Sequence, residues 1–99
     1  MTTTARHELP TLALKAPNFA AVTVGPLTVW FSYSTPIAYR DGENGETVTR
    51  ANDWGPTTGK HLNNVDGGSP AAKAARLDGE TFAARLLAAA DAAWPKADA

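Results

Sequence analysis

The segment from Leu27 to Ser34 restricts the fold more than any other part of the chain. Apolar and polar side chains alternate along it with a period of two, which is the pattern of a half-buried β-strand. The pair Gly25-Pro26 precedes the segment and is a strong turn signal. The alternation predicts a strand with one face on a core and the other in water. Its apolar face consists of Leu27, Val29, Phe31 and Tyr33, and its polar face of Thr28, Trp30, Ser32 and Ser34.

Further strand-forming segments lie on both sides of this one. Residues 19–24 precede the Gly25-Pro26 turn, and residues 37–40 follow a proline, which is typical of a strand start, an edge or a bulge. The segment Asp41–Gly45 contains the hairpin pairs Asp-Gly and Asn-Gly, and residues 46–50, which are rich in β-branched side chains, supply a return strand. The sequence therefore predicts three or four antiparallel strands in a meander.

The alanine-rich last third of the chain predicts two helical segments. Ser69 is a good N-cap for the first, and Pro70 suits the first helical position because no N–H is needed there. Gly79 weakens a continuous helix by about 1 kcal/mol relative to alanine. We therefore expect a break at this point, with Asp78 as the N-cap of the main helix.

The main helix carries one apolar stripe. Phe82 and Leu86 recur at the spacing of one helical face, and Pro95 marks the expected end. A small sheet needs a cover, and this stripe supplies it. The predicted fold class is α+β, a three- to four-stranded antiparallel β-meander with one main C-terminal helix packed on one face. We expect a common core of Val29, Phe31, Tyr33, Val48, Phe82 and Leu86.

The composition along the chain predicts one domain with two short extensions. We expect an irregular N-terminal arm over residues 1–18, a single α+β domain over 19–94 and a flexible tail over 95–99. The start lacks the basic and apolar regions of a signal peptide, and no apolar run is long enough to span a membrane. The sequence therefore predicts a cytoplasmic protein with no membrane partner.

Residue counts exclude several kinds of functional site. The chain has no cysteine, which excludes disulfides, thiolate metal sites and a cysteine nucleophile. Its two histidines, His7 and His61, show no metal-ligand spacing, so we expect no metal and no cofactor. The chain has nine basic and ten acidic residues, which give a formal net charge of −1. This balance is not that of a protein coated with positive charge for nucleic acid.

Residues 53–68 are the strongest candidate for a functional segment. They follow neither the strand nor the helix period, and we expect a long loop with a short helical turn around residues 58–63. The run Gly55–His61 fails the nucleotide P-loop pattern, because its glycines are too close and no Ser or Thr follows Lys60. Its backbone N–H groups and polar side chains still suit an anion or another ligand. The alternative is a structural turn in which Thr and Asn side chains bond their own backbone.

Aromatic side chains add a second candidate surface. Trp30 lies on the polar face of its predicted strand, where it stacks on a base or a partner protein, or is covered by Trp54 or the N-terminal arm. In the loop, Lys60 supplies charge, and His61 and Asn63 supply hydrogen bonds. The candidate ligand- or partner-binding residues are Trp30, Arg40, Trp54, Thr57, Thr58, Lys60, His61 and Asn63, and no residue is assigned as catalytic.

Three segments of the chain carry a resemblance: Val29-Trp30-Phe31-Ser32-Tyr33, Thr35–Arg40 and Trp54–Asn63. In this combination the sequence resembles a family of small uncharacterised bacteriophage and mobile-element proteins, over roughly residues 22–66. The resemblance implies a phage setting and a compact β-rich fold. It implies no activity and identifies no functional residue.

These features predict a small non-enzymatic accessory protein of phage or prophage type in the host cytosol. It binds a host or phage macromolecule through the 54–63 loop and the adjoining sheet face. A protein partner is favoured, because acidic residues outnumber basic ones around the loop. The alternative is a nucleic-acid or nucleotide-binding protein, with counter-defence as one role. The second alternative is an enzyme that uses Lys60 and His61, with Thr57, Thr58 or Ser69 as the nucleophile.

Overall fold

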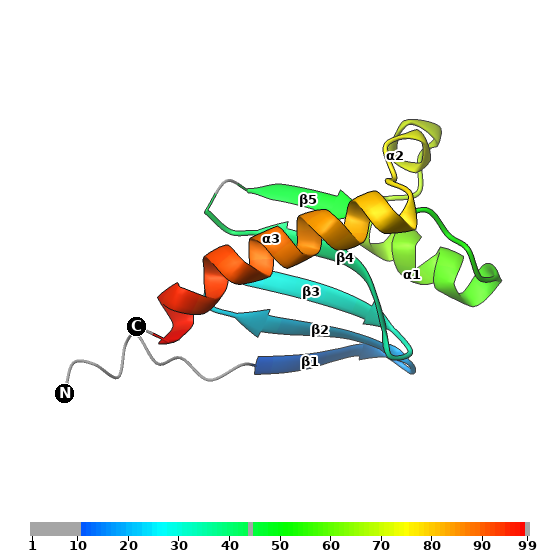
Figure 1. The fold of residues 1–99 in the computed structure, drawn as a ribbon. Coiled ribbons are helices and arrows are strands. Elements are labelled where there is room, and N and C mark those ends of the chain that lie inside the picture. The colour runs from blue at the N-terminus through cyan, green and yellow to red at the C-terminus, as the bar shows by residue number, and fades with distance from the viewer. Residues whose placement is uncertain (1–10, 44, 99) are drawn as a thin grey trace.

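A five-stranded antiparallel meander is the centre of the fold (Figure 1). The computed structural model describes residues 11–43 and 45–98. Each strand pairs with the next one along the chain, in the order β1-β2-β3-β4-β5. The predicted α+β class is confirmed, with more strands than the three or four expected. The strands are β1 (Thr11–Ala16), β2 (Phe19–Val24), β3 (Leu27–Ser32), β4 (Thr35–Asp41) and β5 (Glu46–Thr49).

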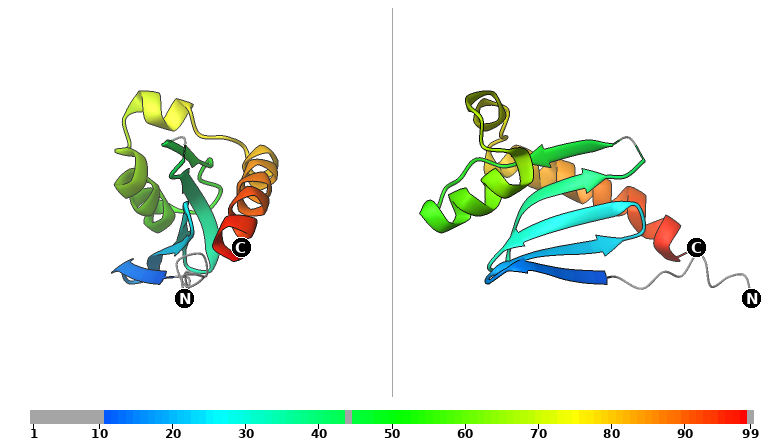
Figure 2. Two further views of the ribbon diagram at one scale, coloured as in Figure 1. Left: turned by 90° about the vertical axis from the view of Figure 1, so that its left-hand side faces the viewer. Right: turned by 180° about the vertical axis from the view of Figure 1, so that it is seen from behind.

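Three helices follow the sheet in the chain: α1 (Pro56–Asp66), α2 (Pro70–Ala74) and α3 (Gly79–Asp98). Seen end-on, α1 and α3 lie on opposite faces of the sheet, and α2 lies beyond β5 between them (Figure 2). The main C-terminal helix therefore covers one face, as predicted, and α1 covers part of the other face.

The core under α3 forms from the predicted helical stripe and one face of the sheet. Phe82 is 2% exposed, and its ring centroid lies 5.9 Å from that of Tyr39. Asp78 caps the helix as predicted, because its Oδ1 accepts the N–H of Thr81 at 2.8 Å. The buried members of this core are Leu27, Tyr39, Val48, Phe82 and Ala93, with Val29 and Leu86 packed against them.

Tyr33 is not part of the core, contrary to the prediction. β3 ends at Ser32, and Tyr33 adopts a left-handed backbone conformation with a φ of 58° in the turn to β4. Its N–H donates to the carbonyl oxygen of Asn18 at 2.7 Å. This turn breaks the alternation, so the Tyr33 ring is 58% exposed. Phe31, from the same predicted face, is only partly buried.

A second core lies under α1, on the other face of the sheet. Phe19, Ile37, Ala38 and Leu62 are buried together. A register shift between β3 and β4 places the consecutive residues Ile37 and Ala38 in the same cluster. Trp30, one of the candidate binding residues, packs against this cluster and is partly buried.

The predicted loop over residues 53–68 is mostly helix. Pro56 stands in the first turn of α1, and Gly67 ends the helix in a left-handed conformation with a φ of 86°. The Gly67 N–H donates to the carbonyl oxygen of Asn63 at 2.8 Å. The buried positions of α1 follow helical spacing, but two of them, Thr58 and His61, are polar. An apolar pattern was therefore absent from the sequence.

Both predicted chain extensions contain regular structure. β1 begins at Thr11, so part of the predicted arm over residues 1–18 is a strand, and residues 1–10 lie outside the described range. α3 continues past Pro95 to Asp98, so the predicted flexible tail is helical up to that residue. The φ that proline imposes is itself helical, and one backbone hydrogen bond is lost at such a position.

Candidate functional site

An open cleft lies between the β3–β4 turn and the start of α1. Its walls are the side chains of Tyr33 and Trp54, which are 58% and 49% exposed. Two adjoining hollows of about 180 and 240 Å³ share Tyr33, Trp54 and Thr58. We call this site the aromatic cleft. The other lining residues are Ser32, Thr35, Ile37, Gly55, Pro56 and Thr57.

Arg50 positions the Trp54 wall of the aromatic cleft. Its guanidinium carbon lies 4.6 Å from the ring centroid of Trp54, and its Nη2 donates to Asp53 Oδ2 at 2.7 Å. The backbone N–H of Trp54 donates to the side-chain oxygen of Asn52 at 2.9 Å. An exposed cation–π contact of this kind contributes about 0.5–1 kcal/mol. These contacts fix the indole while leaving about half of Trp54 exposed to solvent.

The first turn of α1 closes the Trp54 end of the cleft. Gly55 is the N-cap and supplies no side-chain hydrogen bond to the helix. Pro56 has no N–H, and the N–H of Gly59 donates to the carbonyl oxygen of Gly55 at 3.0 Å. The N–H groups of Thr57 and Thr58 therefore belong to a helix start that has no side-chain cap.

Beneath the cleft, three buried polar side chains tie α1 to the sheet. Ser32 Oγ lies 2.7 Å from His61 Nδ1 and 2.9 Å from Thr58 Oγ1. The His61 ring stacks on Phe19, with 4.6 Å between centroids and 5° between ring planes. Burial lowers the pKa of His61 below its usual value. The imidazole is therefore neutral near pH 7 and joins β3 to α1.

The close Ser32–His61 pair does not form an accessible nucleophile and base. A nucleophilic hydroxyl must reach its substrate, but Ser32 is 3% exposed and His61 is 7% exposed. Thr58, one of the expected nucleophiles, is 5% exposed and already bonded to Ser32. Sequence reasoning missed Ser32 because it lies 29 residues from His61 along the chain. The geometry fits a structural role, in which Ser32, Thr58 and His61 join α1 to the sheet. We call these three residues the clasp.

The structure brings three of the predicted site residues to the aromatic cleft: Trp54, Thr57 and Thr58. His61, another predicted site residue, has a buried ring that lies between Ser32 and Phe19 beneath the cleft.

Three other predicted residues do not line the cleft. Arg40 is exposed on β4, where it lies opposite Thr47, and Lys60 is exposed on α1. Asn63 accepts a hydrogen bond at its Oδ1 from Arg76 Nη2 at 3.1 Å. Tyr33, the missed wall residue, had only a weak sequence signal in the nearby Pro36, which marks an irregularity in the strand.

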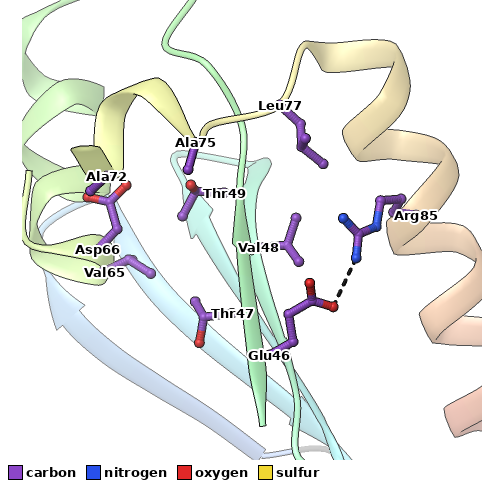
Figure 3. Close-up of a pocket in the computed structure, with 10 residues that line it drawn as sticks. All are labelled: Glu46, Thr47, Val48, Thr49, Val65, Asp66, Ala72, Ala75, Leu77 and Arg85. Carbon is purple, nitrogen blue, oxygen red and sulfur yellow. Dashed lines mark hydrogen bonds and ion pairs between the residues drawn. The ribbon is translucent and has the colours of Figure 1, made fainter. Parts of the chain in front are cut away.

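A larger hollow of about 410 Å³ lies along the outer edge of β5 (Figure 3). Arg76 Nε and Nη2 donate to both carboxylate oxygens of Asp66 at 2.8 and 3.0 Å. On the other wall, Arg85 Nη2 donates to Glu46 Oε1 at 2.9 Å. These charges are paired within the protein, and none of the predicted site residues lines the hollow. We therefore take the aromatic cleft as the candidate site.

Substitutions at two neighbouring positions of α1 compare the stability contribution of the clasp with that of the exposed helix surface. His61→Ala removes the Ser32 bond and the Phe19 stack, so we expect it to lower the free energy of unfolding by about 2–4 kcal/mol. Lys60→Ala is the matched control, because Lys60 is exposed, and we expect a change below about 0.5 kcal/mol. Urea unfolding followed by circular dichroism measures both. Equal effects of the two substitutions would contradict the clasp.

The lowered pKa of His61 also sets the sign of a pH effect on the same measurement. The unfolded chain binds the proton first, at about pH 6.5, because the folded imidazole has the lower pKa. The contribution of neutral His61 to the free energy of unfolding is therefore fully present above about pH 6.5. It declines as the pH falls toward the pKa of the folded state.

The fold and the cleft define a small α+β domain in which a meander sheet carries an exposed aromatic site over a buried polar clasp. A family model described as a family of unknown function (DUF8033) matches residues 2–83. The chain belongs to this family. The matched range contains all five strands, α1, α2 and the start of α3. Comparison with curated proteins and with solved structures gives no match.

Across the described ranges, no helix is both long and apolar enough to span a membrane. Within the same ranges, no three side chains from histidine, aspartate and glutamate gather in a metal-binding arrangement.

Proposed function

We propose that the protein is a small non-enzymatic accessory protein that binds a protein partner through the aromatic cleft. Tyrosine, tryptophan and arginine are the side chains most enriched at the energetic centres of protein interfaces. Tyr33, Trp54 and Arg50 occur together here. The observation that carries the proposal is the exposure of both aromatic residues, 58% for Tyr33 and 49% for Trp54, on the walls of shared hollows.

The open, divided form of the aromatic cleft supports a macromolecular partner over a small molecule. Small-molecule pockets commonly enclose their ligand in one cavity of about 300–1,000 Å³, whereas this cleft is divided into two open hollows of about 180 and 240 Å³. Each has room for a side chain of a partner. The hydroxyls of Ser32 and Thr58 are already bonded to each other, so they leave little hydrogen-bonding capacity for a small polar ligand.

The backbone of Tyr33 supports a functional role for its ring. A left-handed conformation costs a residue with a Cβ about 1–2 kcal/mol, whereas glycine adopts it freely. Strain of this kind is concentrated at binding sites. Tyr33 buries less than half of its surface in return for this strain, because it is 58% exposed.

The proposed setting is the cytosol of a bacterial host that is infected by a phage or carries a prophage. The partner is a host or phage protein. This part of the proposal rests on the sequence resemblance to phage and mobile-element proteins.

A nucleic acid or nucleotide is the second candidate, because the uncapped start of α1 adjoins both aromatic rings. Helix N-termini bind phosphate, and bases stack on aromatic side chains. The charges argue against it. Arg50 is paired with Asp53, and neither Arg40 nor Lys60 lines the cleft. A nucleic-acid complex would weaken steeply between about 50 and 200 mM salt.

A pull-down from a lysate of the bacterial host, with and without nuclease, tests the proposal. We expect a protein that is retained after nuclease treatment. Its affinity, measured with the purified partner, should fall about tenfold or more with Tyr33→Gly or Trp54→Ala. Lys60→Ala is the exposed control and should bind like the wild type. Tyr33→Gly should not lower the melting temperature, because it relieves the strained backbone.

Three outcomes decide against a protein partner at the cleft. Equal binding by all variants would move the interface elsewhere. Loss of the recovered partner after nuclease treatment, or a steep salt dependence of its binding, would favour the nucleic-acid alternative.

A further inference from the structure

Two exposed leucines lie at the first edge of the sheet, away from the aromatic cleft. Leu12 and Leu14 are 70% and 74% exposed, and both belong to β1, whose one partner among the described strands is β2. They lie opposite Val22 and Ala20 of β2, on the face that α3 partly covers. Burial of an exposed leucine is favourable, and an open strand edge is a template for another strand.

The opposite edge of the sheet, at β5, is partly covered by a later segment of the chain. Beyond β5, the N–H of Leu77 donates to the carbonyl oxygen of Thr49 at 2.9 Å, and the N–H of Ala51 donates back to Leu77 at 2.7 Å. The segment after α2 therefore pairs with the end of β5. Arg85 lies beside Glu46 at the start of β5 (Figure 3). In the described part of the chain, no element lies beyond β1 (Figures 1 and 2).

The sheet register fixes which backbone groups of β1 face the open edge. A two-residue turn joins β2 to β3, so the pair beside it, Val24 and Leu27, exchanges both hydrogen bonds. Every second residue of β2 counted from Val24 forms its backbone hydrogen bonds with β3. The residues between them bond to β1, and one of these, Ala21, lies opposite Ala13. The N–H and C=O groups of Leu12 and Leu14 therefore point to the open edge.

We propose that β1 is a dimerisation edge, at which a second copy of the chain adds its own β1 antiparallel about a twofold axis at Ala13. In this register, Leu12 of each copy lies opposite Leu14 of the other, and their backbone groups form four hydrogen bonds. The leucine side chains share one face, with Cβ atoms about 4.5–5.5 Å apart. The two sheets become one, with both α3 helices on the same side.

The sequence of β1 favours this register over its neighbours. A shift by two residues in one direction places a leucine opposite Pro10, which has no N–H. A shift in the other direction places a leucine opposite Ala16, whose backbone pairs with β2. The register about Ala13 uses the edge groups of both leucines and sets Lys15 opposite Thr11 of the second copy. No like charges meet, so the edge is self-complementary.

The size of the contact predicts a dimer of modest affinity. The strand spans about 20 Å at about 3.3 Å per residue. A single pair of strands of this length buries less than the roughly 800 Å² per partner of a standard stable interface. Association should therefore be weak and should depend on protein concentration.

Sedimentation velocity of the full chain over a concentration series tests the dimer. We expect the mass to rise from the 10.4 kDa of the monomer toward twice that value. Leu14→Lys removes two buried leucines per dimer and should raise the Kd by more than about tenfold. Leu87→Lys is the matched control, since Leu87 is 66% exposed but belongs to α3, and it should leave the Kd unchanged.

Amide hydrogen exchange of the wild-type protein gives a readout that needs no substitution. The amides of Leu12 and Leu14 should exchange slowly in concentrated solution and rapidly after dilution. The amide of Ala13 bonds to β2 and should be equally protected in both. A monomer at every concentration, a dimer that Leu14→Lys leaves intact, or leucine amides insensitive to dilution would each overturn the proposal.

Discussion

Phe82→Ala is expected to lower the free energy of unfolding by about 3–5 kcal/mol. Phe82 is 2% exposed and packs against the Tyr39 ring in the core between α3 and the sheet. Removal of the ring leaves a cavity that the neighbouring strands cannot fill by small movements. A domain of this size is stable by about 5–15 kcal/mol in total. The variant should therefore show a large fall in the urea midpoint.

Leu87→Ala is the control for this effect. Leu87 lies on the same helix but is 66% exposed, so we expect a change below about 0.5 kcal/mol. Wild-type stability of Phe82→Ala, or equal losses in both variants, would mean that α3 does not stabilise the sheet through this stripe.

Asp66→Asn is expected to destabilise the protein by about 3–5 kcal/mol, because it leaves the buried Arg76 guanidinium without its counter-ion. The two side chains are 12% and 7% exposed, and Arg76 bonds both carboxylate oxygens. Asp53→Asn is the matched control. Its carboxylate is 63% exposed beside Arg50, so we expect a loss below about 1 kcal/mol. Urea unfolding at neutral pH measures both, and equal losses would contradict the buried pair.

Acid should affect the same buried pair. The hydrogen bonds from Arg76 are the largest cause that lowers the pKa of Asp66 below its usual value, followed by smaller opposing and reinforcing effects. The unfolded carboxylate therefore binds a proton first as the pH falls. The stability that the pair supplies is present above about pH 4 and is lost as the pH falls through the folded pKa. Asp66→Asn should flatten this part of the pH profile.

Local signals in the sequence were sufficient for much of the sheet and for the helix caps. The alternation in β3 and the Gly25-Pro26 turn depend on neighbouring residues alone, and both strands flanking the turn are present. Ser69 Oγ accepts the N–H of Ala72 at 3.1 Å, which confirms the predicted cap of α2. Such features need no knowledge of distant contacts.

Features that depend on tertiary contacts were not predictable in this way. α1 was missed because its buried face includes Thr58 and His61, and these become core residues only where Ser32 and Phe19 meet them. Half of the aromatic cleft was missed for a related reason. Trp54 was a candidate, but the exposure of Tyr33 follows from a turn that interrupts an otherwise regular alternation.

The meander order bears on how quickly the chain reaches its native state. Each strand pairs with the one made immediately before it, and two-residue turns join β1 to β2, β2 to β3, and β3 to β4. Closing such short loops loses little chain entropy, so strand pairing proceeds by a series of local steps. Sheets whose partners are distant in sequence need much slower searches. The helices add long-range steps, because α1 brings His61 to Ser32, 29 residues away in sequence, and α3 brings Phe82 to Tyr39.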